Sequence, residues 1–480
     1  MNKIKNLGEA FIIFAIAFIA YGYFSFGNDW NTNSRLALVK AFVDEGRFEI
    51  DSYHETTGDK AFFNGHYYSD KAIGSSIFGV VAYYPIRWIH YMSTGNLLKI
   101  NQFSNLVTIF GISLPTAFIA PFLYLLVKYI TNEKGTSFLI TLGSILGTPL
   151  FKYSTAFYGH SLAAVFYFWT VFIWFYARRQ NFFSLRLAFV SSILFGFMVI
   201  TEYPTVFLLF FLFLYILYSL HESKQLFNWK IYIVMLIGFL LPVCILFYYN
   251  NIVFGSILST GYLFEANEEF RLAHQQSLMG FGLPNLYNFW YQTFQPAFGI
   301  FWQSPILFLA LPGWYYMFKS KEYRIEAVFT FITVLSYILL FSGYYMWWGG
   351  VSFTPRHLIP ILPLFAFPLA FLPKKFTLLH VICVLISVFQ NLILAASCGL
   401  NGLNGLQKYI DIQLEPAWEK FSIFQPDGML VYDVCLPQVI NGELVVNRGM
   451  DFGLQGISSL VPFFVIELGL LWIFSMRKKI

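Results

Sequence analysis

Long uninterrupted apolar runs recur along the whole chain and restrict its fold more than any other feature. A hydrocarbon core about 30 Å thick is crossed by about 20 apolar helical residues, whereas membrane barrels show short alternating segments. We therefore expect an all-α integral membrane protein with about 12 transmembrane helices. The runs cover residues 10–26, 103–128, 136–150, 159–177, 185–200, 203–220, 230–248, 298–317, 325–343, 356–372, 376–397 and 458–476.

Composition excludes a soluble protein of this size. Of the 480 residues, 58% are hydrophobic and only 11% are charged, and the mean hydropathy is +0.62. A soluble core could not hide so much apolar surface. The first run follows Lys3 and Lys5 as in a signal peptide, but no small-residue cleavage site precedes Asp29, so we interpret it as a retained span.

Basic residues mark the short loops between the runs. If the N-terminus lies inside, every short basic loop falls on the cytoplasmic side, as the positive-inside rule requires. This predicts a multi-pass protein of the cytoplasmic membrane with both termini inside. It also accounts for the net charge of +5 without a nucleic-acid partner. The loop residues are Lys128, Lys134, Arg178, Arg179, Arg186, Lys224, Lys230, Lys319, Lys321, Arg324, Lys374, Lys375 and Arg477 to Lys479.

Most acidic residues then lie outside, in segments too long to be turns. We expect a transmembrane domain over residues 1–397, with long outer loops at 27–102 and 249–297. Residues 398–457 would form an outer loop or small subdomain, and 458–480 the last helix and a basic cytoplasmic tail. In the first loop, the spacing of Leu36, Val39, Phe42 and Val43 predicts a helix that Gly46 ends. The broken run 73–89 is interpreted as a helix in the membrane interface.

The first outer loop contains a dense polar cluster. Acid, base and imidazole side chains come within a dozen residues at Asp59, His66, Asp70 and Lys71. Carboxylates at a membrane surface can deprotonate a hydroxyl, hold a metal or pair with cations. A solvated charge run is the structural alternative. Because glycines for tight turns accompany the cluster and an apolar run follows it, we favour a functional site.

Three further positions carry polar chemistry at the predicted outer ends of spans. Glu202 is either functional or part of a salt bridge between helix ends. His160 opens a span where unpaired N–H groups attract anions, although a hydrogen-bonded histidine is the common alternative. Arg356 follows Trp347-Trp348-Gly-Gly and Pro355, where it could grip a phosphate or extend to lipid headgroups.

The order of these motifs resembles GT-C membrane glycosyltransferases, and more closely their bacterial protein-mannosyltransferase and lipid A aminoarabinose-transferase branch. The resemblance spans about residues 30 to 372, through short motifs. They are Ser34-Arg35-Leu-Ala37, Asn64-Gly-His-Tyr-Tyr-Ser-Asp-Lys71, Asn251 with Phe254-Gly255 and Gly261-Tyr262, Gly299 with Ser304-Pro305, and Trp348-Gly-Gly with Pro355-Arg356.

The resemblance implies transfer of a sugar from a polyprenyl-phosphate carrier to an acceptor hydroxyl, with inversion, outside the membrane. It implies that the Tyr68-Ser-Asp-Lys71 turn holds the carrier phosphate, with Arg356 as a second cation. That branch commonly has an acid just before the arginine helix, where this chain has Thr32-Asn33-Ser34-Arg35. We expect Asp59 to be the base, with Asp70, Asp51 and Asp29 as alternatives. Candidates to line the cavity are His66, His160, Glu202, Tyr262 and Trp348.

Other functions and ligands stay open at this point. A twelve-span secondary transporter would show two related halves and midplane charges, but no repeat is visible and Glu467 is nearly alone within the spans. A polysaccharide polymerase or ligase and a non-catalytic assembly factor are further alternatives.

We predict no cofactor, leaving a divalent cation open. Cys398 and Cys435 are either a disulfide or two thiols. The expected partners are the lipid-linked donor, membrane lipid and a glycan, lipid or protein acceptor.

Overall fold

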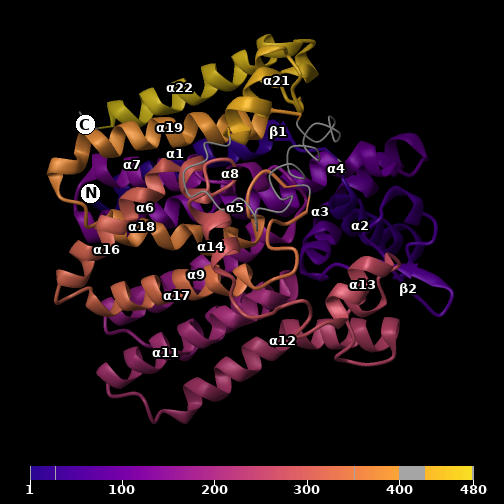
Figure 1. Cartoon of the computed structure of the whole chain (residues 1–480), viewed down its shortest axis with the longest axis horizontal. Coiled ribbons are helices and arrows are strands. Elements are labelled where there is room, and N and C mark those ends of the chain that lie inside the picture. Colours follow the sequence, from indigo (N-terminus) through magenta and orange to yellow (C-terminus); the bar gives the residue numbers. More distant parts are fainter. Residues whose placement is uncertain (1, 28, 351, 399–427, 478–480) are drawn as a thin grey trace. The chain divides into compact units, whose positions relative to one another are not determined.

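The structure is a computed structural model that describes residues 2–27, 29–350, 352–398 and 428–477. It is mostly helical, with four short strands (Figure 1). Seven helices in these residues are long and apolar enough to cross a membrane, which confirms an α-helical membrane protein. The total of about 12 spans stays a prediction. The seven are Ile100–Thr131, Gly159–Arg179, Tyr203–Glu222, Trp229–Phe254, Arg324–Ser342, Lys374–Ala396 and Gly456–Met476.

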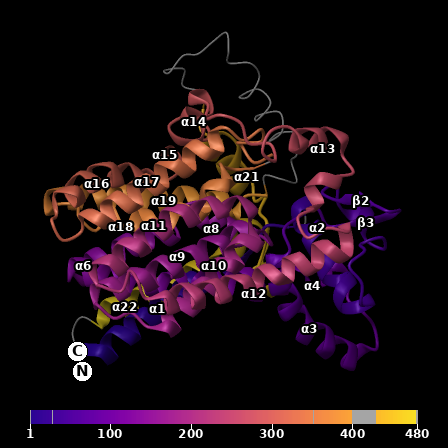
Figure 2. The same cartoon turned by 90° about the horizontal axis from the view of Figure 1, so that it is seen from below.

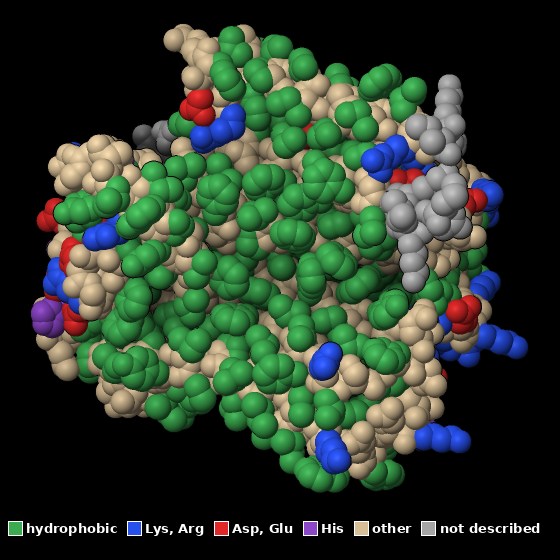
Figure 3. Space-filling model, turned by 180° about the vertical axis from the view of Figure 1, so that it is seen from behind, with side chains coloured by type: hydrophobic (Ala, Val, Ile, Leu, Met, Phe, Trp, Pro, Cys, Tyr) green, Lys and Arg blue, Asp and Glu red, His purple; other side chains and the backbone are tan. Residues whose placement is uncertain are grey.

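Four shorter apolar helices add to these, and three of them match predicted runs. They are Leu7–Tyr23, Leu185–Thr201, Arg356–Leu369 and Val431–Ile440. The surface agrees with a lipid environment, because hydrophobic side chains cover most of the face seen in Figure 3 and charged ones are sparse there. Exposed aromatic and aliphatic side chains such as Phe210, Leu236 and Trp472 lie on these apolar helices. In water such a surface would drive aggregation.

The chain divides into two compact units, each assembled from separate stretches of sequence. One unit comprises Met1–Gly27, Ala117–Thr155 and Leu283–Ile480, and the other comprises Asn28–Thr116 and Ala156–Gly282. The second unit contains the first-loop polar cluster, and we call it the loop unit. We call the first the terminal unit, since it holds both chain ends.

In the loop unit, α10 packs against both α9 and α12 (Figure 2). Glycines permit this packing: a Cβ on Gly196 would lie 2.7 Å from the Phe239 carbonyl oxygen of α12. The helices are α2 Trp30–Lys40, α3 Gly74–Thr94, α4 Ile100–Thr108, α9 Gly159–Arg179, α10 Leu185–Thr201, α11 Val206–Glu222, α12 Trp229–Phe254 and α13 Glu268–Gln275, and the strands are β2 Ala61–Phe63 and β3 His66–Tyr68. Helix α5, Leu114–Ala117, follows at the boundary.

The terminal unit joins the two ends of the chain. Strand β1 pairs antiparallel with β4, with Phe24 opposite Asn447, and α1 packs against α22. The helices are α1 Asn2–Tyr23, α6 Ile119–Thr131, α7 Lys134–Ile145, α8 Leu150–Tyr153, α14 Leu286–Thr293, α15 Ile300–Gln303, α16 Ala310–Lys319, α17 Arg324–Ser342, α18 Ala366–Leu369, α19 Thr377–Ala396, α21 Leu436–Ile440 and α22 Val461–Met476, and the strands are β1 Phe24–Ser25 and β4 Val446–Asn447.

Several local predictions can now be compared with the structure. The first-loop helix is present as α2, which continues into a π-turn over Ala41–Glu45 and ends at Gly46 with φ 69°. The broken run 73–89 forms one helix, α3, despite Pro85. Of the predicted segment 398–457, residues 399–427 lie outside the described residues. All four cysteines are unpaired, so Cys398 and Cys435 are two thiols.

Candidate functional site

A tight hairpin in the loop unit precedes the polar turn that leads into α3. Strands β2 and β3 pair with Ala61 opposite Tyr68, and Asn64 and Gly65 adopt φ values of 49° and 87°, as the short turn of a hairpin requires. Directly after the hairpin, the chain runs through Ser69 to Lys71 and enters α3 at Gly74. A Cβ there would lie 2.2 Å from Thr201 Oγ1, so the turn is fixed against the end of α10.

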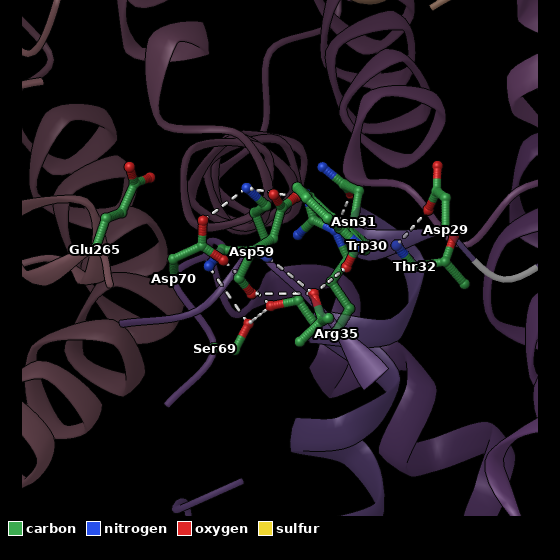
Figure 4. Close-up of polar contacts among 12 residues, drawn as sticks. Asp29, Trp30, Asn31, Thr32, Arg35, Asp59, Ser69, Asp70 and Glu265 are labelled. Atoms are coloured by element: carbon green, nitrogen blue, oxygen red, sulfur yellow. Dashed lines mark hydrogen bonds and ion pairs between the residues drawn. The ribbon is translucent and has the colours of Figure 1, made fainter. Parts of the chain in front are cut away.

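Lys71 lies between two carboxylates. Its Nζ atom is 2.7 Å from Asp70 Oδ2 and 2.9 Å from Asp59 Oδ2, and its side chain is only 12% exposed. Figure 4 shows Asp59 and Asp70 side by side, with dashed lines marking their ion pairs. Ser34 of α2 donates to the second oxygen of Asp70 at 3.2 Å. The structure thus brings together three of the residues that the sequence singled out.

Burial determines the electrostatics of this cluster. Removal from water raises the pKa of Asp70 to about 7, with Asp59 and Glu265 adding to the shift and Lys71 opposing it. Burial alone would lower the pKa of Lys71, but Asp59 and Asp70 outweigh it and hold that pKa well above its usual value. Lys71 is therefore a permanent cation at neutral pH, surrounded by an excess of acid.

Asp29 occupies the position just before the arginine helix. Its carboxylate caps α2 by accepting from Thr32 N at 2.8 Å, and Tyr158 donates a hydrogen bond to its other oxygen. In Figure 4, Asp29 and Thr32 lie apart from Asp59 and Asp70. Asp29 therefore has a clear structural role as a helix cap.

Glu202 lies beside both Arg35 and His160. Arg35, 2% exposed, lies 3.3 Å from Glu202 Oε1, and His160 Nδ1 lies 3.4 Å from the same oxygen. Arg35 also donates to Ala72 O and Ser75 Oγ. Of the two interpretations of Glu202, the structure favours the salt bridge, since it connects α2, α9 and α10 around the Lys71 turn. His160 lies at ion-pair distance from the same Glu202 oxygen and is part of this group of charges.

Asp51 and His66 form a separate pair on the hairpin. His66 Nδ1 lies 2.7 Å from Asp51 Oδ2, and Tyr67 N donates to Asp51 Oδ1 at 2.7 Å. Burial would raise the pKa of Asp51, but these two hydrogen bonds outweigh it and lower that pKa. Tyr68 packs its ring edge against Phe254, and burial raises its pKa to about 12. These contacts fix the hairpin in place.

A second segment completes the cluster with Tyr262, one of the predicted cavity-lining residues, and Glu265, which was not among them. Glu265 forms a β-bridge with Ala61 and is 3% exposed, with its carboxylate 3.4 Å from His274 Nδ1. Tyr262 places its ring 5.8 Å from Lys71 Nζ and stacks on His274. Acidic residues in outer loops were visible in the sequence, but a contact over about 200 residues of chain was not.

Arg356 and Trp348 belong to the terminal unit. Arg356 begins the 3-10 helix Arg356–Phe365 after Pro355, and Gly349 adopts φ 86° beside the Arg356 side chain. Trp348 packs with its neighbour Trp347. A Cβ on Gly349 would lie 3.0 Å from Arg356 Cγ, so the arginine side chain packs closely against this glycine.

Two other features bear on the choice of site. In the described part of the chain, no group of three or more His, Cys, Asp or Glu side chains could hold a metal ion. A cavity of about 550 Å³ lies among α9, α10, α11 and α12, but no acidic or basic side chain lines it. Such a cavity suits a hydrocarbon chain. The charged groups that a polar reaction requires lie in the Lys71 cluster.

Comparisons with known proteins leave the site to be judged on its geometry. No protein-family model and no curated protein sequence matches the chain. The fold and the cluster together define an α-helical membrane protein with a buried lysine held between two carboxylates.

Proposed function

We propose that the protein is a glycosyltransferase of the cytoplasmic membrane. It would move a sugar from a polyprenyl-phosphate carrier to an acceptor hydroxyl at the outer face, with inversion. The observation that carries the proposal is Lys71, a buried cation within contact distance of Asp59 and Asp70. The order of short motifs, which resembles the GT-C glycosyltransferases, adds support from the sequence.

The chemistry of this transfer needs both charges of the cluster. As the sugar leaves, the carrier phosphate gains negative charge, and a positioned cation such as Lys71 stabilises it. The attacking hydroxyl must lose its proton to a carboxylate within hydrogen-bond reach. Asp59 is our choice for this base, because it contacts Lys71 and keeps 14% of its side chain exposed, whereas the Asp70 side chain is 2% exposed.

Asp29 is the second choice for the base. It directly precedes α2, but both of its oxygens accept hydrogen bonds from Thr32 and Tyr158. An acceptor hydroxyl would therefore have to compete with these two donors for the Asp29 carboxylate. Comparison of Asp59→Asn with Asp29→Asn therefore decides between them.

The test is a transfer assay with the purified full-length protein in proteoliposomes. A panel of polyprenyl-phosphate sugars, each carrying a radiolabelled sugar, is incubated with envelope lipid and glycan acceptors. We expect one donor to lose its label to an acceptor, and Asp59→Asn and Lys71→Ala to abolish the transfer. Glu269→Gln removes an exposed carboxylate of the same unit and serves as the matched control.

Folding must be separated from chemistry in this assay. Lys71→Ala leaves two buried carboxylates without their cation, so the double variant Lys71→Ala with Asp59→Asn restores part of the balance. Each variant is compared by size-exclusion profile and melting temperature. Full transfer by well-folded Asp59→Asn and Lys71→Ala would sink the assignment of the site, and label uptake without a glycosylated product would indicate a transporter.

A further inference from the structure

The charge arrangement around Lys71 raises a difficulty for any anionic ligand. Both acidic neighbours already contact the ammonium group, at 2.7 and 2.9 Å, and Tyr262 and Glu265 also act on its charge. A phosphate that binds Lys71 has to take the place of one of these contacts. If both carboxylates stayed, the phosphate would add charge to a site that already holds more acid than base.

The two carboxylates differ in how firmly they are held. Asp70 is buried, accepts from Ser34 Oγ at 3.2 Å, and lies so close to Gly261 that a Cβ on that glycine would be 2.6 Å from Asp70 Cα. The Asp59 side chain is more exposed than that of Asp70. Among the described residues, Lys71 is the one polar partner of the Asp59 carboxylate. Asp59 is therefore the carboxylate that can leave.

The backbone of Asp59 can stay in place while its side chain turns. Its N–H donates to Thr57 Oγ1 at 3.0 Å, and Thr57 Oγ1 in turn donates to Trp30 O at 2.7 Å. Gly58 lies against the Trp30 ring, where a Cβ would be 2.6 Å from the ring. Rotation about the side-chain bonds alone then separates the carboxylate from Lys71.

We propose that Asp59 masks Lys71 in the substrate-free protein, and that the donor phosphate displaces Asp59 and thereby frees it to act as the base. This inference rests on the proposed function. In the transfer step, the acceptor oxygen forms a bond to the anomeric carbon of the sugar. The bond from that carbon to the phosphate oxygen breaks, its electron pair goes to the phosphate held by Lys71, and the acceptor proton goes to the Asp59 carboxylate.

The exchange alters the protonation of the cluster. A carboxylate beside a newly bound phosphate holds a proton more tightly. Asp70, whose pKa burial raises to about 7, lies beside Lys71 with Glu265, so proton uptake near neutral pH reports chiefly on Asp70. The affinity for phosphate is therefore the measure of the contact between Asp59 and Lys71.

Farnesyl phosphate, an isoprenyl monophosphate without a sugar, is a suitable probe. Its binding to the full-length protein in nanodiscs is measured by calorimetry in two buffers of different ionisation enthalpy, which gives affinity and proton uptake together. We expect Asp59→Asn to bind about tenfold more tightly than wild type, because the competing carboxylate is gone. Asp70→Asn should gain less affinity and take up less proton, because Asp70 is not displaced and titrates near neutral pH, and Glu269→Gln should match wild type.

The outcomes separate the two proposals. If farnesyl phosphate does not bind, or binds equally to well-folded Lys71→Ala, both the phosphate site and the exchange are wrong. If it binds through Lys71 but Asp59→Asn shows unchanged affinity, the exchange is overturned and the phosphate site stands. A larger gain of affinity in Asp70→Asn than in Asp59→Asn also overturns the exchange.

Discussion

The loop unit contains two buried ion clusters with opposite composition. At Lys71 one cation meets two carboxylates, whereas at Asp44 one carboxylate, 1% exposed, meets two cations, Lys40 at 2.5 Å and Arg87 at 2.7 Å. Tyr83 also donates to Asp44, and Lys40 donates to Leu98 O. The Asp44 cluster has a partner for each charge and connects α2 with α3.

The comparison teaches how a structural cluster differs from a chemical one. At Asp44 cations exceed acid, and the carboxylate that joins them is held by Lys40, Arg87 and Tyr83, so no carboxylate there is free to leave its cations. The Lys71 cluster carries excess acid, one member of which is loosely held, and so it can exchange a partner. Four experiments test this contrast, beginning with the largest expected effect.

Removing Lys71 should affect catalysis above all. We expect Lys71→Ala to lower transfer by about 10²–10³-fold, the usual cost of losing one group that stabilises developing negative charge. The measurement is the turnover of the labelled donor per folded molecule. Lys40→Ala, the matched change in the Asp44 cluster, should leave turnover per folded molecule within about twofold of wild type. Equal losses in both variants would contradict the contrast.

Removing Asp44 should affect stability above all. Asp44→Asn leaves Lys40 and Arg87 without their carboxylate, and breaking a buried ion pair in this way costs about 3–5 kcal/mol. We expect a clear fall in the free energy of unfolding, measured by denaturant titration in detergent. An unfolding midpoint equal to that of wild type would show that the cluster is not a structural link.

The acid excess at Lys71 should make stability depend on pH. Burial raises the pKa of Asp70 to about 7 from its ordinary value of 3.8, so the folded protein binds more protons than the unfolded chain between these values. The stability that comes from this extra proton on Asp70 is therefore lost as pH rises from about 4 to about 7. We expect the melting temperature to fall less steeply from pH 5 to pH 8 in Asp70→Asn than in wild type. Parallel curves would argue against a raised pKa.

The smallest effect is expected at the hairpin. His66 is half-exposed and pairs with Asp51 at 2.7 Å. Exposed pairs contribute little, so His66→Ala should cost less than about 1 kcal/mol of unfolding free energy. Thermal denaturation of the variant beside Asp44→Asn measures both on one scale, and a larger loss for His66→Ala would reverse the proposed order.

Local features of this fold follow from the sequence, and distant contacts do not. The helix before Gly46 and the nearness of Asp59, Asp70 and Lys71 were predicted, because each depends on residues close in the chain. The hairpin was not predicted, since its strands have three residues each and show little alternation. Glu265 was recognised as an outer acid, but its return to Ala61 depends on packing that no local pattern encodes.

Glu202 and Asp29 show a further limit. From the sequence alone, a carboxylate at the end of a span is equally consistent with a reactive group and with half of a salt bridge. The choice requires knowledge of its partner. Arg35, which decides the matter for Glu202, lies 167 positions earlier. Asp29 likewise caps a helix whose first residue could not be fixed from the sequence to within one position.

At four glycines near the cluster there is no room for a methyl group. A Cβ would lie within 3 Å of Trp30 at Gly58, of Thr201 at Gly74, of Glu202 at Gly159 and of Asp70 at Gly261. Together with Asp59, Lys71 and Arg35 they form a spatial fingerprint that is spread over about 230 residues of sequence. A search for distant relatives should therefore weight these few scattered positions together, rather than any continuous motif.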